Sequence, residues 1–176
     1  MLAGARVRLR PLRDNDWTVF TAWGETRDQL WGSFQRYQLD HLTHLREAYE
    51  RTRLLTRESA WLLIERNTDH APVGFVRYGL MALPDGELPT PEIGFGIPDV
   101  RARGQGYATE AVRLIMEYLF AGFPTPRISA FTEAENIPAQ RVLEHAGFDH
   151  EGTLRRAMFR DGAWRDMLLY AALRHE

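Results

Sequence analysis

Two hydrophobic patterns alternate along the chain. Apolar residues at every second position are typical of half-buried strands, and apolar residues three or four apart are typical of amphipathic helices. The first pattern predicts strands at 7–12, 60–66, 73–80, 92–97, 127–132, 148–159 and 164–173. The second pattern predicts helices at 15–23, 40–55, 106–120 and 136–147. Strands that alternate with helices predict a mixed α/β fold, and Asp161-Gly162 predicts a tight turn between the last two strands.

Composition limits the size of the fold and its partners. At 176 residues, with 44% hydrophobic and 26% charged, the chain is long enough for one compact domain, 1–176, and too short for two ordinary ones. Its formal net charge of −2 argues against nucleic-acid binding, which requires a basic face. There is no run of about 18 apolar residues, and no apolar signal segment follows the first arginines. We therefore expect a cytoplasmic protein that binds neither nucleic acid nor membrane.

The missing residue types exclude several kinds of chemistry. The chain has no cysteine, and all 22 of its basic residues are arginine. Disulfides, thiolate nucleophiles, P-loop lysines and Schiff-base lysines are therefore excluded. Serine occurs only at Ser33, Ser59 and Ser129, outside any G-x-S-x-G turn, which argues against a nucleophile-elbow hydrolase. Covalent catalysis therefore has few candidate nucleophiles.

A glycine-rich loop opens the helix predicted at 106–120. The loop "RGQGYA" comprises Arg103, Gly104, Gln105, Gly106, Tyr107 and Ala108. The first turn of a helix carries unpaired N–H groups and the positive end of the helix dipole, and glycines let an anion approach that backbone. With Arg101 and Arg103 adding charge, the loop is a candidate cradle for a pyrophosphate, although two glycines also suit a simple tight turn. It is not a dinucleotide fingerprint, because Thr109 stands where a third glycine is required.

From this loop onward the chain resembles the GCN5-related N-acetyltransferases (GNAT), which transfer acetyl from acetyl-coenzyme A (acetyl-CoA) to an amine. The family signature R/Q-x-x-G-x-G/A is met by "RGQGYA", and it also fits two residues earlier, from Arg101. "ENIPAQRVLEHAGF" (135–148) is similar to the family's asparagine-led helix, and "GTLRRAMFRDGAWRDMLLYAAL" (152–173) is similar to the closing hairpin of the RimJ/RimL branch. The resemblance implies a GNAT fold, in which a central twisted mixed sheet is splayed in the middle and flanked by helices.

The resemblance also implies how acetyl-CoA is held. The pantetheine arm would bond to the backbone of Phe95, Gly96 and Ile97, between the strands at 92–97 and 127–132. The pyrophosphate would lie on the amides of the "RGQGYA" loop. Asn136 would contact coenzyme A through its side chain, although a plain N-cap role explains the same residue.

Catalytic residues are the weakest part of the resemblance. An attacking amine must lose a proton, and Glu92 is the best candidate for the base. Because side chains alternate between the two faces of a strand, Glu92 should lie on the face opposite to the apolar Ile93. An ordinary strand-end glutamate is the alternative. Tyr170 is a weaker candidate for giving a proton to the thiolate. Two turns after the asparagine, where many relatives place a general-acid tyrosine, this chain has Glu144; one turn after it, where RimL-like relatives place a serine, it has Ala139.

Other residues that attract attention have plain structural explanations. His41 and His44 share a helix face, but no third ligand lies nearby in the sequence, and we predict no metal. The aromatic residues of the first part of the chain either shape an acceptor pocket or belong to the core: Trp17, Trp23, Trp31, Phe34 and Tyr37. The alternative function is a GNAT-fold sensor that binds acyl-CoA without efficient turnover. The sequence leaves open which amine is acetylated and whether the chain forms a homodimer.

Overall fold

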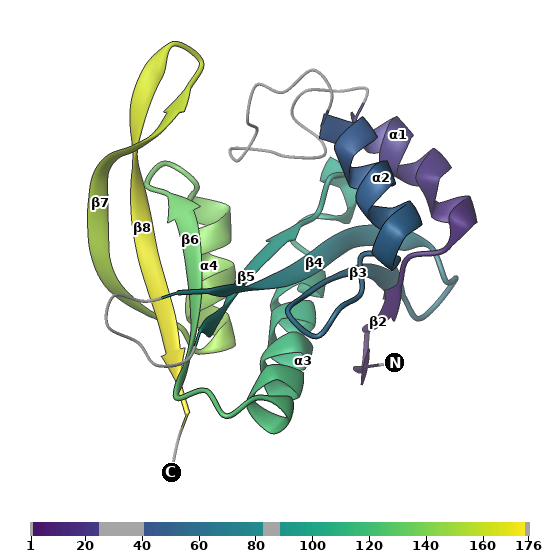
Figure 1. Ribbon diagram of the computed structural model, residues 1–176, viewed down its shortest axis with the longest axis horizontal. Helices are drawn as coiled ribbons and strands as arrows, with labels where there is room; N and C mark the ends of the chain where they lie inside the picture. The colour runs from purple at the N-terminus through teal and green to yellow at the C-terminus, as the bar shows by residue number, and fades with distance from the viewer. Residues whose placement is uncertain (1, 25–40, 83–88, 175–176) are drawn as a thin grey trace.

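The computed structural model describes residues 2–24, 41–82 and 89–174. Within these residues one sheet contains the strands β1 (Leu2–Ala3), β2 (Val7–Pro11), β3 (Ser59–Arg66), β4 (Pro72–Met81), β5 (Thr90–Gly96), β6 (Arg127–Glu133), β7 (Asp149–Arg160) and β8 (Ala163–Leu173). The strand order is β1-β2-β3-β4-β5-β6-β8-β7, and every neighbouring pair is antiparallel except β5 and β6 (Figure 1). The predicted mixed α/β sheet is confirmed, and β1 was not predicted.

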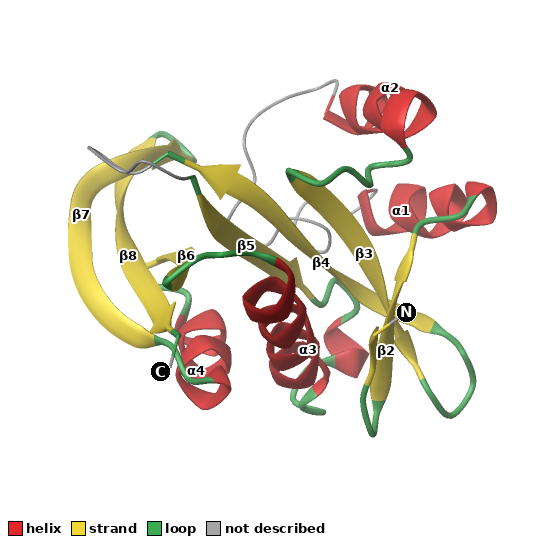
Figure 2. Ribbon diagram, turned by 60° about the horizontal axis from the view of Figure 1, so that its bottom comes forward, coloured by secondary structure: helices red, strands yellow, loops and turns green. Residues whose placement is uncertain are grey.

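Helices cover both faces of the sheet (Figure 2). They are α1 (Trp17–Gly24), α2 (His41–Thr52), α3 (Tyr107–Gly122) and α4 (Ile137–Ala146). On α3 the buried side chains recur three or four residues apart and pack with α4 in the main core. α1 and α2 pack on the opposite face, against Leu63 of β3 and Phe75 of β4. Each predicted helix is therefore present, and no helix of the described residues is long and apolar enough to cross a membrane.

β5 and β6 part near the middle of the sheet. Their parallel pairing includes only Glu92 with Ser129 and Ile93 with Ala130. Beyond these pairs β5 continues to Gly96 and β6 to Glu133, without pairing to each other. The backbone of β5 is therefore left with a free edge beyond Ile93, which confirms the predicted splay in the middle of the sheet.

The aromatic residues near the N-terminus belong to the second core. Trp17 is 9% exposed and Trp23 is 7% exposed, and the Trp17 ring meets that of Tyr49 edge-on at 5.2 Å between centroids. For these two tryptophans the structure supports the core interpretation over an acceptor pocket. Trp31, Phe34 and Tyr37 lie outside the described residues.

Candidate functional site

Two left-handed glycines shape the loop between β5 and α3. Gly104 has φ 72° and Gly106 has φ 79°, a backbone conformation that side chains with a Cβ rarely adopt. Gly106 is the N-cap of α3, and no side chain caps the helix there. The first N–H groups of α3 therefore have neither an intrahelical partner nor a side-chain cap, and an anion can approach them.

The two arginines predicted to add charge also make local structural contacts. Arg103 donates from Nε to the Ile97 carbonyl at 2.8 Å and from Nη2 to the Pro98 carbonyl at 3.2 Å. Arg101 donates from Nε and Nη2 to the Asp99 carboxylate at 3.1 and 3.0 Å, and this contact raises the pKa of Arg101. Arg103 thus fastens the loop to the residues that follow β5, and the contact of Arg101 lies within the loop itself.

A third arginine, which sequence reasoning missed, lies at the N-terminus of α3. Arg6 donates from Nη1 to the Gln105 carbonyl at 2.9 Å. A Cβ added to Gly106 would lie 2.8 Å from the same nitrogen. Glu110 of α3 holds the segment in place by accepting from the backbone N–H of Arg6 at 3.0 Å. Because 99 positions separate Arg6 from Gln105, no local sequence pattern links them.

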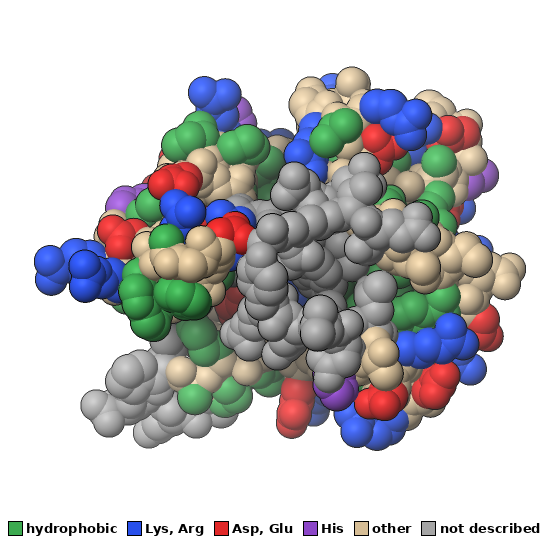
Figure 3. All heavy atoms as spheres, turned by 90° about the horizontal axis from the view of Figure 1, so that it is seen from above, with side chains coloured by type: hydrophobic (Ala, Val, Ile, Leu, Met, Phe, Trp, Pro, Cys, Tyr) green, Lys and Arg blue, Asp and Glu red, His purple; other side chains and the backbone are tan. Residues whose placement is uncertain are grey.

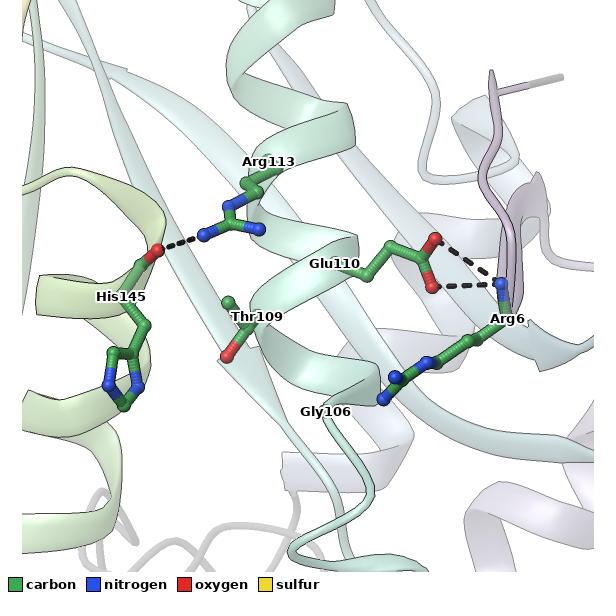
Figure 4. Close-up of a pocket in the computed structure, with 6 residues that line it drawn as sticks. All are labelled: Arg6, Gly106, Thr109, Glu110, Arg113 and His145. Atoms are coloured by element: carbon green, nitrogen blue, oxygen red, sulfur yellow. Dashed lines mark hydrogen bonds between the residues drawn. The ribbon is translucent and has the colours of Figure 1, made fainter.

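Two cavities adjoin the loop. One has a volume of about 390 Å³, lies beside α3 and is lined by Arg6, Gly106, Thr109, Glu110, Arg113 and His145 (Figure 4). The other has a volume of about 420 Å³ and is lined by Ala5, Arg6, Arg66, Asn67, Thr68, Gln105 and Tyr107. In the first cavity Arg113 donates to the backbone carbonyl of His145 and so joins α3 to α4. Arg6 borders both cavities, which makes it the basic side chain best placed to meet an anion at the loop.

Glu92 lies at the point where β5 and β6 part. Its side chain is 20% exposed and lies on the face away from the buried Ile93, as strand parity predicts. Its carboxylate accepts from Arg77 of β4, at 3.1 Å from Nη1 and 3.4 Å from Nη2. Glu92 is therefore not an ordinary exposed strand-end residue, because a guanidinium holds it beside the parted strands.

Two buried hydroxyl groups on the same face lack partners. Ser129, directly opposite Glu92 in the parallel register, is fully buried, and Thr90 is 5% exposed. Within the described part of the chain neither hydroxyl oxygen has a hydrogen-bond partner. A buried hydroxyl without a partner costs free energy, so such groups mark places where water or a ligand belongs. Sequence reasoning noted Ser129 only as an unsuitable nucleophile.

Tyr170 lies on the other face of the sheet from Glu92. It is 2% exposed and pairs with Ala130 of β6 in the β6–β8 register. Its hydroxyl donates a hydrogen bond to Glu144 of α4 at 3.2 Å. Burial, and then the contact with Glu144, raises the pKa of Tyr170. The structure therefore does not bring the two predicted catalytic residues together. The position that the resemblance assigns to a general acid, seven residues after Asn136, is Leu143 rather than Glu144, and Leu143 is buried in the main core and has no proton to give.

Asn136 has an identifiable structural role, and His44 lies at the surface. Asn136 Oδ1 accepts from the backbone N–H of Ala139 at 3.3 Å, so its N-cap role is confirmed. His44 lies 3.5 Å from Glu47 at the surface of α2, and the side chain of His41 lies outside the described residues. Among the side chains that the structure describes, no three potential metal ligands gather. Figure 3 shows basic and acidic side chains interspersed on the upper face rather than separated by sign.

Comparison with curated proteins shows relatives that share about half of this chain. The "Probable N-acetyltransferase YjcK" of Bacillus subtilis (strain 168) is 40% identical over 88 residues, which are 50% of this chain and 48% of that protein. The "Uncharacterized N-acetyltransferase YnaD" of the same organism is 36% identical over 87 residues, which are 49% of this chain and 51% of that protein. The chain thus matches about half the length of each of these two relatives.

Solved structures match over nearly the whole chain. Mycobacterium smegmatis RimJ, in complex with CoA-disulfide, has a TM-score of 0.75 at 27% identity, over 96% of this chain and 86% of that chain. A spermidine N-acetyltransferase from Vibrio cholerae, in complex with CoA and spermine, has a TM-score of 0.78 at 20% identity, over 97% and 96%. The second likeness shows the fold alone. The Acetyltransferase (GNAT) domain profile matches residues 6–149, and the chain therefore belongs to the GNAT acetyltransferase family.

Proposed function

We propose that this protein transfers an acetyl group from acetyl-CoA to an amine, by direct attack of the amine in a ternary complex. The observation that carries the proposal is the combination of a free strand edge with a glycine-shaped helix N-terminus at its end. β5 loses its partner after Ile93, and the loop that leaves β5 leads to the uncapped start of α3 at Gly106. The free edge of β5 can bind a peptide-like arm, and the N-terminus of α3 can bind a pyrophosphate at one end of that arm.

The residues present fit acetyl-CoA, which would supply an acetyl thioester at the parted strands. Phe95 and Gly96 would bind the pantetheine arm through the free edge of β5. Ile97, whose carbonyl accepts from Arg103, remains a proposed backbone contact. The amides from Gly104 to Ala108 would bind the pyrophosphate, with Arg6 beside them. Asn136, at the start of α4, remains a proposed side-chain contact.

The chemistry needs little from the protein besides positioning and proton removal. The nitrogen lone pair of a neutral amine attacks the thioester carbonyl carbon, a C–N bond forms, and the C–S bond breaks to release the coenzyme A thiolate. We assign proton removal from the amine to Glu92, directly or through a water molecule. A thiol with a pKa near 8.5 leaves readily without a dedicated acid. Tyr170 is a weak candidate for that role, because its hydroxyl already donates to Glu144.

We extend the proposal to the amine acceptor, the cellular location and the domain organisation. Both the RimJ structure at 27% identity and the closing hairpin support a RimJ/RimL-like enzyme that acetylates a protein N-terminus or a small amine. We place it in the cytoplasm as one domain, 1–176, with acetyl-CoA and an amine as its partners, and leave open a homodimer. The alternative is a GNAT-fold sensor of acyl-CoA, which the lack of an evident general acid favours.

The test is a panel of amines mixed with acetyl-CoA, in which release of free thiol is followed. Acceleration by one class of amine would establish the activity and rule out the sensor. If acetyl-CoA binds in calorimetry but no amine accelerates thiol release, the sensor replaces the enzyme.

A further inference from the structure

Arg77 lies on the face of the sheet from which an amine would approach. In the β4–β5 register it is directly opposite Gly94, the residue that follows the last β5–β6 pair. A Cβ added to Gly94 would lie 2.9 Å from Nε of Arg77 and 3.2 Å from the central guanidinium carbon. The guanidinium therefore covers the backbone of Gly94, on the opposite side of β5 from the main core. The side chain is 33% exposed, so a ligand can reach it.

The ion pair between Arg77 and Glu92 is loose enough for another carboxylate to replace Glu92. Close guanidinium–carboxylate pairs have N–O distances of about 2.7–2.9 Å. Here the two distances are 3.1 and 3.4 Å, and both side chains reach solvent. A partly exposed pair at these distances contributes little stability, so another carboxylate can take the place of Glu92. While both oxygens of Glu92 accept from the guanidinium, the carboxylate is held toward Arg77 rather than toward the amine.

We propose that the acceptor carries a carboxylate next to its amine, and that this carboxylate takes the guanidinium of Arg77 and frees Glu92 to act as the base. The inference rests on the proposed function. Arginine presents its N–H groups in a planar fork that matches a carboxylate, which gives direction as well as charge. A second cation placed against Arg77 is repelled, so a polyamine is a poor acceptor. The proton of the ammonium group passes to Glu92, and the neutral nitrogen then attacks the thioester carbonyl carbon. The C–S bond breaks, and a second N–H proton leaves the nitrogen for the departing thiolate, which gives the amide and the free thiol.

Two sources offer this chemistry: a free amino acid, or a polypeptide whose first residue is aspartate. Matched pairs separate them. The first pair is alanine with alaninamide, and the second is a short peptide that begins with aspartate with the same peptide beginning with asparagine. Rates of thiol release are compared at equal concentrations of neutral amine, so that differences in amine basicity cancel. We expect kcat/KM to be at least about 30-fold higher for the carboxylate member of one pair, in line with discrimination by a paired polar site.

Arg77→Gln is the decisive variant. It should abolish the preference, so that the carboxylate acceptor and its amide have the same kcat/KM, and it should preserve acetyl-CoA affinity in calorimetry. Arg77→Lys should retain part of the preference, because it keeps the charge and loses the fork. Arg8→Gln is the matched control, since Arg8 is a strand arginine 28% exposed in an ion pair with Glu65. Melting curves of all three variants show whether the fold is intact.

The outcomes are distinct. Equal wild-type rates within both pairs, or a carboxylate preference that survives Arg77→Gln in a folded variant, would overturn the inference and leave the acetyltransferase proposal standing. Absence of amine-dependent thiol release with every acceptor, polyamines included, would overturn the proposed function and this inference with it. Loss of the preference in Arg77→Gln alone supports both.

Discussion

The two faces of the parted strands are built in different ways. On the side of α3 and α4, the candidate acetyl-CoA site consists mainly of backbone groups: the free edge of β5 and the first amides of α3. On the side of α1 and α2, the candidate acceptor site consists of side chains from three strands, Arg77, Glu92 and Ser129. Backbone recognition requires a local conformation, whereas side-chain recognition requires residues that folding brings together.

This difference predicts how the two faces respond to mutation. The conformation of the loop depends on glycines at two fixed positions, so a short motif is enough to specify it. Side chains on neighbouring strands can change one at a time without disturbing that loop. We therefore expect mutations on the α3 side to change acetyl-CoA affinity, and mutations on the α1 side to change rate and acceptor choice.

The largest effect is expected from Glu92 on the acceptor face, where a mutation should change the rate but not the affinity for acetyl-CoA. Glu92→Gln should lower kcat/KM by on the order of a hundredfold or more and remove the acidic limb of the pH–rate profile, because glutamine cannot take up a proton. Acetyl-CoA affinity in calorimetry should stay unchanged. Glu117→Gln, on the exposed side of α3, is the control. A Glu92→Gln variant with nearly full rate and the same acidic limb would remove Glu92 from the site.

The corresponding change on the α3 side is Gly106→Val. A valine at φ 79° is strained, and its Cβ would lie 2.8 Å from Arg6 Nη1, in the space that the phosphates need. We expect acetyl-CoA affinity to fall by about 30-fold, or about 2 kcal/mol. Gly162→Val is the matched control, because Gly162 has φ 75° and open space around it. Both variants should lose about 1–2 kcal/mol of stability from backbone strain, but only Gly106→Val should lose affinity.

Unchanged affinity in a folded Gly106→Val variant would contradict the cradle. The loop would then be a tight turn with no part in binding, and the backbone on the α3 side would not recognise the pyrophosphate.

Much of the fold could be predicted from the sequence because hydrophobic periodicity is local. The helix at 106–120 and the strand at 92–97 differ from α3 and β5 only at their ends, and the Asp161-Gly162 turn has the two positive φ angles that a two-residue hairpin requires. The glycine loop was also predictable, since the family motif specifies its conformation.

The side-chain contacts were less predictable. Arg101 and Arg103 are charged residues beside a glycine loop, and sequence alone does not show that Asp99 and the carbonyls of Ile97 and Pro98 accept from them. Arg6 and Arg77 reach the site only because β1–β2 and β4 lie beside α3 and β5. Register decides that Ser129 lies opposite Glu92 and that Tyr170 lies on the other face, and it depends on pairings between distant segments.

A smaller effect should follow from removing Arg6. Arg6→Gln takes away one charge near the α3 N-terminus while the amides remain, so acetyl-CoA affinity should fall by about fivefold, or roughly 1 kcal/mol. The loss should shrink as salt concentration rises, because salt screens exposed charges. Arg46→Gln, on the surface of α2, is the control for net charge. Equal affinities in Arg6→Gln and the wild type, measured by calorimetry at low salt, would assign the anion site to the backbone alone.

The smallest effect is expected from Ser129. Its mutation tests whether the unpaired hydroxyl on the acceptor face contributes to catalysis. Ser129→Ala removes a fully buried hydroxyl without a described partner, so the protein should be as stable as the wild type or slightly more stable. Thr125→Val, just before the same strand, removes a hydroxyl that donates to the Arg127 carbonyl at 2.7 Å, and should cost about 1 kcal/mol in urea unfolding. If Ser129 orients the water or the acceptor beside Glu92, Ser129→Ala should also lower kcat severalfold, whereas Thr125→Val should not. A Ser129→Ala variant that is less stable and equally fast would show that the hydroxyl has a structural partner, and the side-chain half of the comparison would then rest on Arg77 and Glu92 alone.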